Sequence, residues 1–162
     1  GSRTGFVGGM LYIMTHSIAK AGLFLCCGIV EHTVHTKDLT KMGGLAKVMP
    51  VTAAAFLLSA LSVMGIPPFS GFFAKYLVIS GTVEAGQPLL AAVFILGAVM
   101  TVLYLLRLFR MVFLGKCAFP DVREGSPAML GAAVGLALLS LLLGLVMSWP
   151  SALAALIGGA SL

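Results

Sequence analysis

The stretch Gly65-Ile-Pro-Pro-Phe-Ser-Gly71 interrupts an otherwise apolar run that covers residues 50–84. Pro67 and Pro68 each lack a backbone N–H, and their rings clash with the preceding turn of a helix. The glycines at the two ends of the stretch supply backbone that tolerates unusual dihedral angles. The stretch therefore predicts one helix up to residue 64, a break at 65–71, and a second helix after it.

The composition of the whole chain is that of a membrane protein. Of its 162 residues 60% are hydrophobic and only 9% are charged, whereas soluble domains carry about 25% charged residues. This excludes a soluble enzyme. The net charge of +5 does not indicate nucleic-acid binding, because the basic residues form no solvated stripe with interleaved aromatic residues. We predict an all-α fold, a polytopic bundle of transmembrane helices forming a single membrane domain over 1–162.

The apolar segments and their boundaries predict the helices. About 20 residues cross the hydrocarbon core of a bilayer, and three uninterrupted segments reach this length: 5–34, 88–115 and 127–149. The two pieces of 50–84 are each too short to span alone, so they form either one interrupted crossing or two short spans joined by an external turn. Trp149 suits a membrane interface, and the tail 151–162 suits an interfacial turn.

The positions of the basic residues decide between these two arrangements. If 50–84 crosses once, one side of the membrane collects seven of the ten: Lys37, Lys41, Lys47, Arg107, Arg110, Lys116 and Arg123. The other side then holds only Arg3. If 50–84 crosses twice, the seven are split between the two sides. The positive-inside rule favours the single broken crossing, four crossings in all, and places the seven-residue side in the cytoplasm and both termini opposite.

Two lysines, Lys20 and Lys75, lie at membrane depth. An ionisable group there costs about 2.5–3.5 kcal/mol on insertion scales and is a candidate functional group. Lys75 follows the break by about one turn, where desolvation and the positive end of the second half-helix both favour the neutral amine. His16 lies one turn from Lys20 on the same helix face, and histidine titrates near neutral pH. These three residues predict a proton relay beside a broken helix, a recurring arrangement in transporters.

Several plainer interpretations remain open. Either lysine could extend to the head groups, His16 could be a packing residue, and the break could be a kink without function. Glu31 and His35 near one end of the first segment, and Glu84 at the other end of the bundle, are candidates for proton entry or exit, or are solvated charges. The three cysteines lack metal-binding spacing, and no nucleotide-binding loop is present. We expect no metal and no cofactor.

Three stretches of the chain resemble a known family. They are Met14-Thr-His-Ser-Ile-Ala-Lys-Ala-Gly-Leu-Phe-Leu25, Lys41-Met-Gly-Gly-Leu-Ala-Lys47 and Gly65-Ile-Pro-Pro-Phe-Ser-Gly-Phe-Phe-Ala-Lys75. In this order they are similar to antiporter-like subunits of respiratory complex I, of Mrp-type cation/proton antiporters and of membrane-bound hydrogenases. The resemblance implies that Lys75 belongs to a central hydrophilic axis that carries protons, and that His16 and Lys20 match signature residues of a neighbouring helix.

The resemblance covers most of residues 5–80. Family members are much longer and contain two inverted repeats, so it implies that this chain is the C-terminal part of such a subunit: a fragment, a split gene product or a truncation. It implies partner subunits that carry out quinone and electron-transfer chemistry, a multi-pass location in a prokaryotic inner membrane, and protons as the transported ion. The alternatives are a subunit of a sodium/proton antiporter, with Na⁺ also transported, and a structural membrane subunit that conducts nothing.

Overall fold

A computed structural model describes residues 2–147. It contains the helices α1 Arg3–Val34, α2 Pro50–Met64, α3 Ser70–Glu84, α4 Pro88–Phe113 and α5 Pro127–Met147. No strand occurs within residues 2–147, so the predicted all-α class is confirmed. Trp149, the last residues of the predicted span 127–149, and the tail 151–162 lie outside the described residues.

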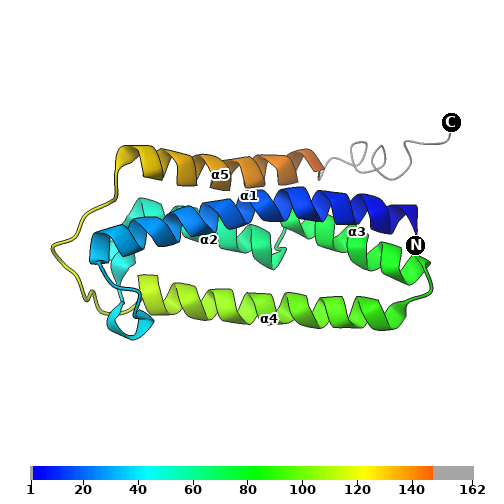
Figure 1. The fold of residues 1–162 in the computed structure, drawn as a ribbon, viewed down its shortest axis with the longest axis horizontal. Coiled ribbons are helices and arrows are strands. Elements are labelled where there is room, and N and C mark those ends of the chain that lie inside the picture. The colour runs from blue at the N-terminus through cyan, green and yellow to red at the C-terminus, as the bar shows by residue number, and fades with distance from the viewer. Residues whose placement is uncertain (1, 148–162) are drawn as a thin grey trace.

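The chain passes along the bundle four times. Figure 1 shows α1, α4 and α5 as long rods, with α2 and α3 following each other end to end along the same direction. Helices α1, α4 and α5 are each long and apolar enough to span a membrane, whereas α2 is apolar but short. Since α2 and α3 together make one pass, the structure forms a polytopic bundle with a single broken crossing, as predicted.

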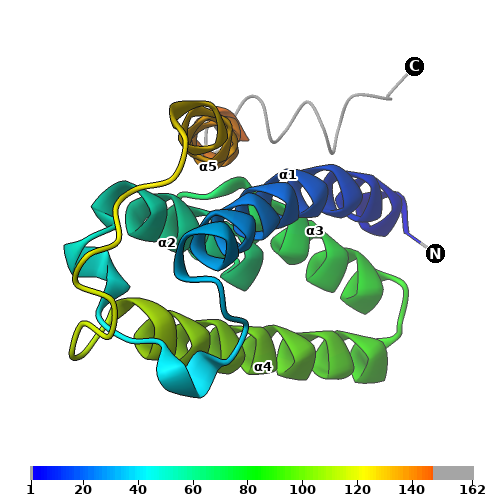
Figure 2. The same cartoon turned by 60° about the vertical axis from the view of Figure 1, so that its left-hand side comes forward.

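The helices are arranged around a central layer. Helix α1 packs against α2, α3 and α5, and α4 contacts α2 and α3. Figures 1 and 2 both show α4 and α5 on opposite sides of the layer formed by α1, α2 and α3. Large apolar side chains on the outer face of α4 are exposed, among them Leu89, Val93, Leu96, Met100 and Leu103. This distribution is that of a helix bundle in lipid, where the outer surface is as apolar as the interior.

Small residues allow α1 and α3 to approach closely. A Cβ atom on Gly8 would lie 2.7 Å from the backbone nitrogen of Val78, and one on Gly81 would overlap the backbone of Gly5. The hydroxyl of Ser2 accepts a hydrogen bond from the Gly5 N–H at 3.0 Å and donates one to the Gly81 carbonyl at 2.7 Å. Close backbone contact of this kind is the main source of helix association in lipid.

The start of α2 is capped from a distant loop. Met49 precedes Pro50 and offers no side-chain acceptor. The Glu124 carboxylate, from the loop between α4 and α5, accepts hydrogen bonds from the Val51 N–H and the Thr52 hydroxyl, both at 2.6 Å. A carboxylate at this position satisfies free backbone N–H groups and complements the helix dipole.

The loop between α1 and α2 contains two short 3-10 turns, Leu39–Lys41 and Leu45–Lys47. Gly44 adopts φ 65°, a left-handed conformation that glycine tolerates, and its N–H donates to the Leu114 carbonyl at 2.8 Å. The turn at Gly43 and Gly44 therefore anchors this loop to the end of α4. In the same loop, hydrogen bonds from the side chain and backbone of Thr40 lower the pKa of Asp38 from its usual value.

Candidate functional site

The break between α2 and α3 is closed locally by glycine. Gly65 has φ 81°, and its N–H donates to the carbonyls of Leu61 and Ser62 at 3.1 and 3.0 Å. The Ile66 N–H donates to the same Leu61 carbonyl at 3.1 Å. This is the left-handed closure by which many helices end. The non-helical part covers residues 65–69, inside the predicted break at 65–71.

The Lys75 side chain extends from α3 across the break to the end of α2. The residue is only 7% exposed, and its Nζ donates a hydrogen bond to the Met64 carbonyl at 3.0 Å. Carbonyls in the last turn of a helix have no partner within it and carry partial negative charge. Lys75 therefore caps the end of α2 although it belongs to the second turn of α3. Since the break lies between the two ends of the bundle (Figure 1), the Lys75 side chain ends inside the bundle and does not extend to either of its ends.

This arrangement adds to the expectation drawn from the sequence. From its position along the chain, Lys75 is expected to lie near the positive end of α3, and no negative helix end is expected beside it. The folded chain places the negative end of α2 within hydrogen-bond distance of the same ammonium. The ammonium form therefore has one unfavourable and one favourable helix end as neighbours, in addition to the effect of desolvation.

Two cavities meet at Lys75 on the side of α4. One, of about 260 Å³, is lined by residues of α2, α3 and α4, including Met64 and Tyr76. The other, of about 370 Å³, lies between α1, α3 and α4 and is lined by Tyr12 and Thr101 among others. A water molecule takes about 30 Å³ in the liquid and needs polar partners. The ammonium and the two hydroxyl-bearing residues supply such partners, so the second cavity is suited to hold water.

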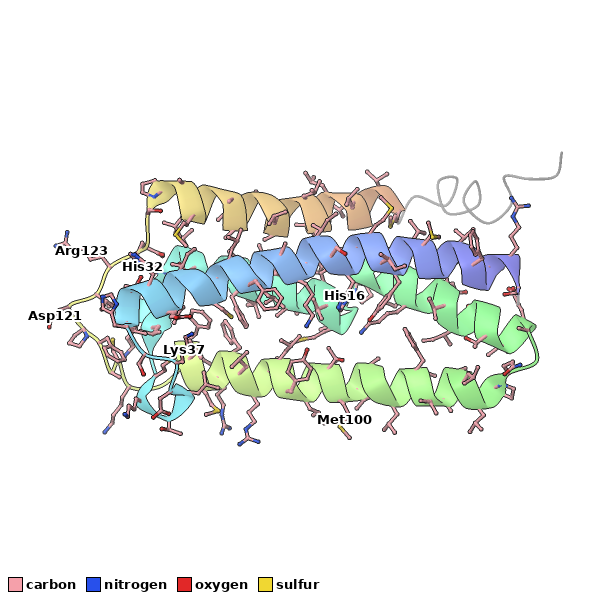
Figure 3. All side chains as sticks on the ribbon, in the orientation of Figure 1. His16, His32, Lys37, Met100, Asp121 and Arg123 are labelled. Atoms are coloured by element: carbon pink, nitrogen blue, oxygen red, sulfur yellow. The ribbon has the colours of Figure 1, made fainter. Side chains whose placement is uncertain are left out.

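His16 and Lys20 lie on α1, the helix that contributes Tyr12 to the second cavity. Figure 3 shows His16 at the level of the break between α2 and α3. Its imidazole stacks on the Tyr12 ring, with centroids 5.1 Å apart, and interacts electrostatically with both Lys20 and Lys75. Lys20 is half-buried and lines a third cavity, of about 140 Å³, between α1, α2 and α4. The structure thus brings the three main candidates together on the α4 side of α1.

The other candidates lie at the ends of the bundle. The Glu31 carboxylate forms an ion pair with Lys37 at 3.1 Å, and the Glu31 backbone carbonyl accepts a hydrogen bond from the His35 N–H at 2.9 Å. His35 ends α1 with φ 54°, and its ring centroid is 6.3 Å from that of His32. Figure 3 places His32 and Lys37 at one end of the bundle. Exposed Glu84 is the last residue of α3, so none of these residues lies beside Lys75.

The comparison with known families places this geometry in context. Residues 1–101 match the family model described as NADH:quinone oxidoreductase/Mrp antiporter, TM. This match covers more than half of the chain, including α1, both halves of the broken crossing and Lys75. The chain belongs to this family. It is accordingly a multi-pass integral membrane protein.

Individual relatives agree with this assignment. NADH-quinone oxidoreductase subunit L of Mycobacterium tuberculosis is 40% identical over 116 residues, which cover 69% of this chain and 18% of the relative. Na(+)/H(+) antiporter subunit A1 of Staphylococcus haemolyticus is 32% identical over 158 residues, covering 87% of this chain and 19% of the relative. The chain thus spans about a fifth of the length of these curated relatives.

Solved structures of two complexes contain the same fold. One chain of the Mrp complex from Dietzia sp. DQ12-45-1b aligns with a TM-score of 0.84 and 29% identity, over 98% of this chain and 39% of that chain. A chain of the membrane-bound sulfane sulfur reductase, an archaeal respiratory membrane complex, aligns with a TM-score of 0.85 and 26% identity, over 90% of this chain and 24% of that one.

Several residues at the site were not predicted from the sequence. Tyr12 precedes His16 by one helical turn, a spacing that would have placed it on the same face. The structure also buries three serines around the break: Ser62, Ser70 and Ser140. Their occurrence inside apolar segments could have marked them as candidates. Within residues 2–147, no group of three His, Cys, Asp or Glu side chains is placed to hold a metal ion.

Proposed function

We propose that this chain is part of a proton-translocating membrane subunit of a redox-driven complex resembling NADH:quinone oxidoreductase, with Lys75 as the central proton-carrying group. The observation that carries the proposal is the buried Lys75 ammonium at a helix break, bonded to the Met64 carbonyl and bordering two cavities. Family membership supports it, because subunits of NADH-quinone oxidoreductases are among the relatives. Ionisable groups inside membrane bundles mark ion and proton pathways.

The proposed step is a change in the protonation state of Lys75. A proton arriving through water in the cavities converts the amine to an ammonium, which donates to the Met64 carbonyl. When a neighbouring positive charge makes the ammonium unfavourable, the proton leaves through the cavity lined by Tyr12. His16 interacts electrostatically with both lysines and links Lys75 to Lys20. Lys20 in turn connects this part of the path to the remainder of the subunit or to an adjacent one.

The place of the chain in a larger assembly is part of the same proposal. The stretches that resemble the family come from the end of its second repeat, so we assign the chain to the C-terminal part of an antiporter-like subunit. Partner chains then supply the first repeat and the redox chemistry. The bacterial relatives support a location in a bacterial plasma membrane.

A second function is favoured by one of the comparisons. The relative in Staphylococcus haemolyticus is a subunit of a Na(+)/H(+) antiporter, and the Mrp complex of Dietzia shares the fold. A sodium/proton antiporter would use the same lysine for its proton-carrying half-reaction. Replacing Na⁺ by choline in the transport assay distinguishes the two functions: a redox pump keeps its rate of proton movement, whereas an antiporter loses it.

The substitution Lys75→Ala tests the proposal in the reconstituted parent complex. We expect proton translocation to fall at least about tenfold, a change in effective barrier of about 1.4 kcal/mol or more, while the complex still assembles. Lys116→Ala is the matched control, because Lys116 is exposed in the loop after α4. A purely structural subunit would instead translocate protons at an unchanged rate in both variants.

A further inference from the structure

We propose that Ser140 of α5 is a positioning residue for Lys75: its hydroxyl holds the end of α2 and the start of α3 together and so fixes the gap that Lys75 bridges. The proposal rests on the function proposed for Lys75. It concerns the side of the break that faces away from the cavities, and it assigns a role to α5, which contributes no ionisable group.

The hydrogen bonds of Ser140 join the two half-helices directly. Its hydroxyl donates to the Ser62 hydroxyl at 2.6 Å and lies 3.2 Å from the Ser70 hydroxyl. All three side chains are 0–1% exposed. Ser62 precedes Met64 by two residues, and Ser70 precedes Lys75 by five. The three hydroxyls therefore connect the segment that carries the acceptor carbonyl to the segment that carries the ammonium donor.

The backbone around these hydroxyls is tightly packed. Gly144 lies one turn after Ser140 on α5, and a Cβ atom there would overlap the Pro68 carbonyl oxygen and lie 2.5 Å from the Ser70 nitrogen. A Cβ atom on Gly71 would overlap the Ser62 carbonyl oxygen. Helix α5 therefore packs directly against the break. At Gly144 no side chain separates the backbone of α5 from residues 68–70.

The two sides of the break consequently differ. On the α5 side, hydroxyl bonds and backbone contacts fill the space, which is one of the ways in which irregular backbone is tolerated at membrane depth. On the α4 side, Lys75 borders two cavities. This asymmetry lets the Lys75 side chain change its position while the backbone break stays fixed.

Removing the Ser140 hydroxyl leaves the Ser62 and Ser70 hydroxyls without their bond across the helices. Buried hydroxyls that lose a partner are unfavourable, and a small network of this kind loses more than one bond at a time. The two half-helices then relax relative to each other, and the distance between the Met64 carbonyl and the Lys75 ammonium is no longer fixed.

The test uses Ser140→Ala in the full-length parent complex. We expect proton translocation to fall about tenfold or more, because misplacing a reacting group by about 1 Å can cost an enzyme up to about a hundredfold in rate. We also expect an altered pH dependence of translocation and faster hydrogen exchange of the backbone N–H groups within 65–72, all residues there except the two prolines. Thr33→Val is the control, because the Thr33 hydroxyl donates to the Ile29 carbonyl of its own helix; it should leave all three readouts unchanged.

The outcomes separate this proposal from the previous one. If Lys75→Ala abolishes translocation while Ser140→Ala keeps the wild-type pH dependence and exchange rates, the positioning role is wrong and the function of Lys75 stands. If Lys75→Ala has no effect, the proposed function fails, and hydrogen exchange alone decides whether Ser140 holds the break. Should Ser140→Ala fail to assemble, Ser70→Ala removes only the longer bond, and unchanged exchange at 65–72 in that variant overturns the proposal.

Discussion

Opposing effects act on the ammonium group of Lys75, the residue proposed to carry protons. Burial and the positive start of α3 disfavour its ammonium form, whereas the Met64 carbonyl at 3.0 Å favours it. In the proposed function, the charge of neighbouring groups then decides whether Lys75 holds or releases its proton. His16 and Lys20 of α1 are the neighbours proposed for this role.

Tyr12 makes a testable contribution at the same scale. Its ring stacks on His16 at 5.1 Å and meets the Phe94 ring edge-on at 5.7 Å. We expect Tyr12→Ala to release the His16 imidazole and to lower proton translocation severalfold, because aromatic pairs contribute about 0.5–1.5 kcal/mol beyond area burial. Tyr12→Phe keeps the ring contacts and should retain most of the activity. Equal loss in both variants would mean that the hydroxyl, and not the stacking, is what matters.

At the scale of the helices, α2 is capped at both of its ends by groups from other parts of the chain. Glu124 caps the start of α2, and the Lys75 ammonium caps its end. The short helix α2 therefore depends on groups that are supplied from outside it.

The Glu124 cap gives a prediction for stability. Glu124→Ala removes the acceptor for the Val51 N–H and the Thr52 hydroxyl, so we expect the free energy of unfolding to fall by about 0.5–2 kcal/mol, the usual effect of losing a helix N-cap. Denaturant unfolding of the purified protein in detergent measures the change. Asp121→Ala in the same loop is the control, since Asp121 is exposed. A control variant as unstable as Glu124→Ala would rule out the capping role.

The close contact at Gly71 gives a second prediction for stability. In Gly71→Ala the new methyl group would overlap the Ser62 carbonyl oxygen, and we expect a loss of about 1–3 kcal/mol or more, typical of overpacking. Gly9→Ala is matched in chemistry and lies in α1, where a Cβ atom meets nothing within 4 Å. Thermal unfolding of the two variants should therefore differ clearly. Similar melting temperatures would show that the break adapts to the methyl group.

The helix ends could be predicted from sequence because their determinants are local. A glycine followed by two prolines ends a helix in any protein, and here it ends α2. Pro50 and Pro88 stand at the first position of their helices, where proline is favoured. The bonds that complete the site are not local. Thr52 and Glu124 are 72 residues apart, and Ser62 and Ser140 are 78 apart. The bond between Lys75 and Met64 joins residues eleven apart across the break, a spacing that helical periodicity does not describe.

At the scale of the whole molecule, the four passes place the loop of residues 35–49 and the loop after α4 at one end of the bundle (Figures 1 and 3). The turn between α3 and α4 lies at the other end, near the N-terminus. From the positive-inside rule we expect the first end, which holds seven basic residues, to face the cytoplasm.

Cysteine labelling tests this orientation. With Cys26, Cys27 and Cys117 replaced, we expect Lys41→Cys to react with a membrane-impermeant maleimide in inverted vesicles only. Gln87→Cys, in the turn before α4, should react in intact cells only. Both positions are exposed, so accessibility within the protein does not bias the comparison. Reaction of both variants from the same side would contradict the single broken crossing.

The most direct test of Lys75 as a proton carrier is the substitution Lys75→Arg, measured as proton translocation by the reconstituted parent complex. Arginine keeps the positive charge and can donate to the Met64 carbonyl, but its guanidinium does not release a proton in the physiological pH range. We expect the variant to assemble and to translocate protons at least about tenfold more slowly than wild type. Wild-type translocation by Lys75→Arg would show that Lys75 is only a structural cap of α2, and would contradict the proposed function.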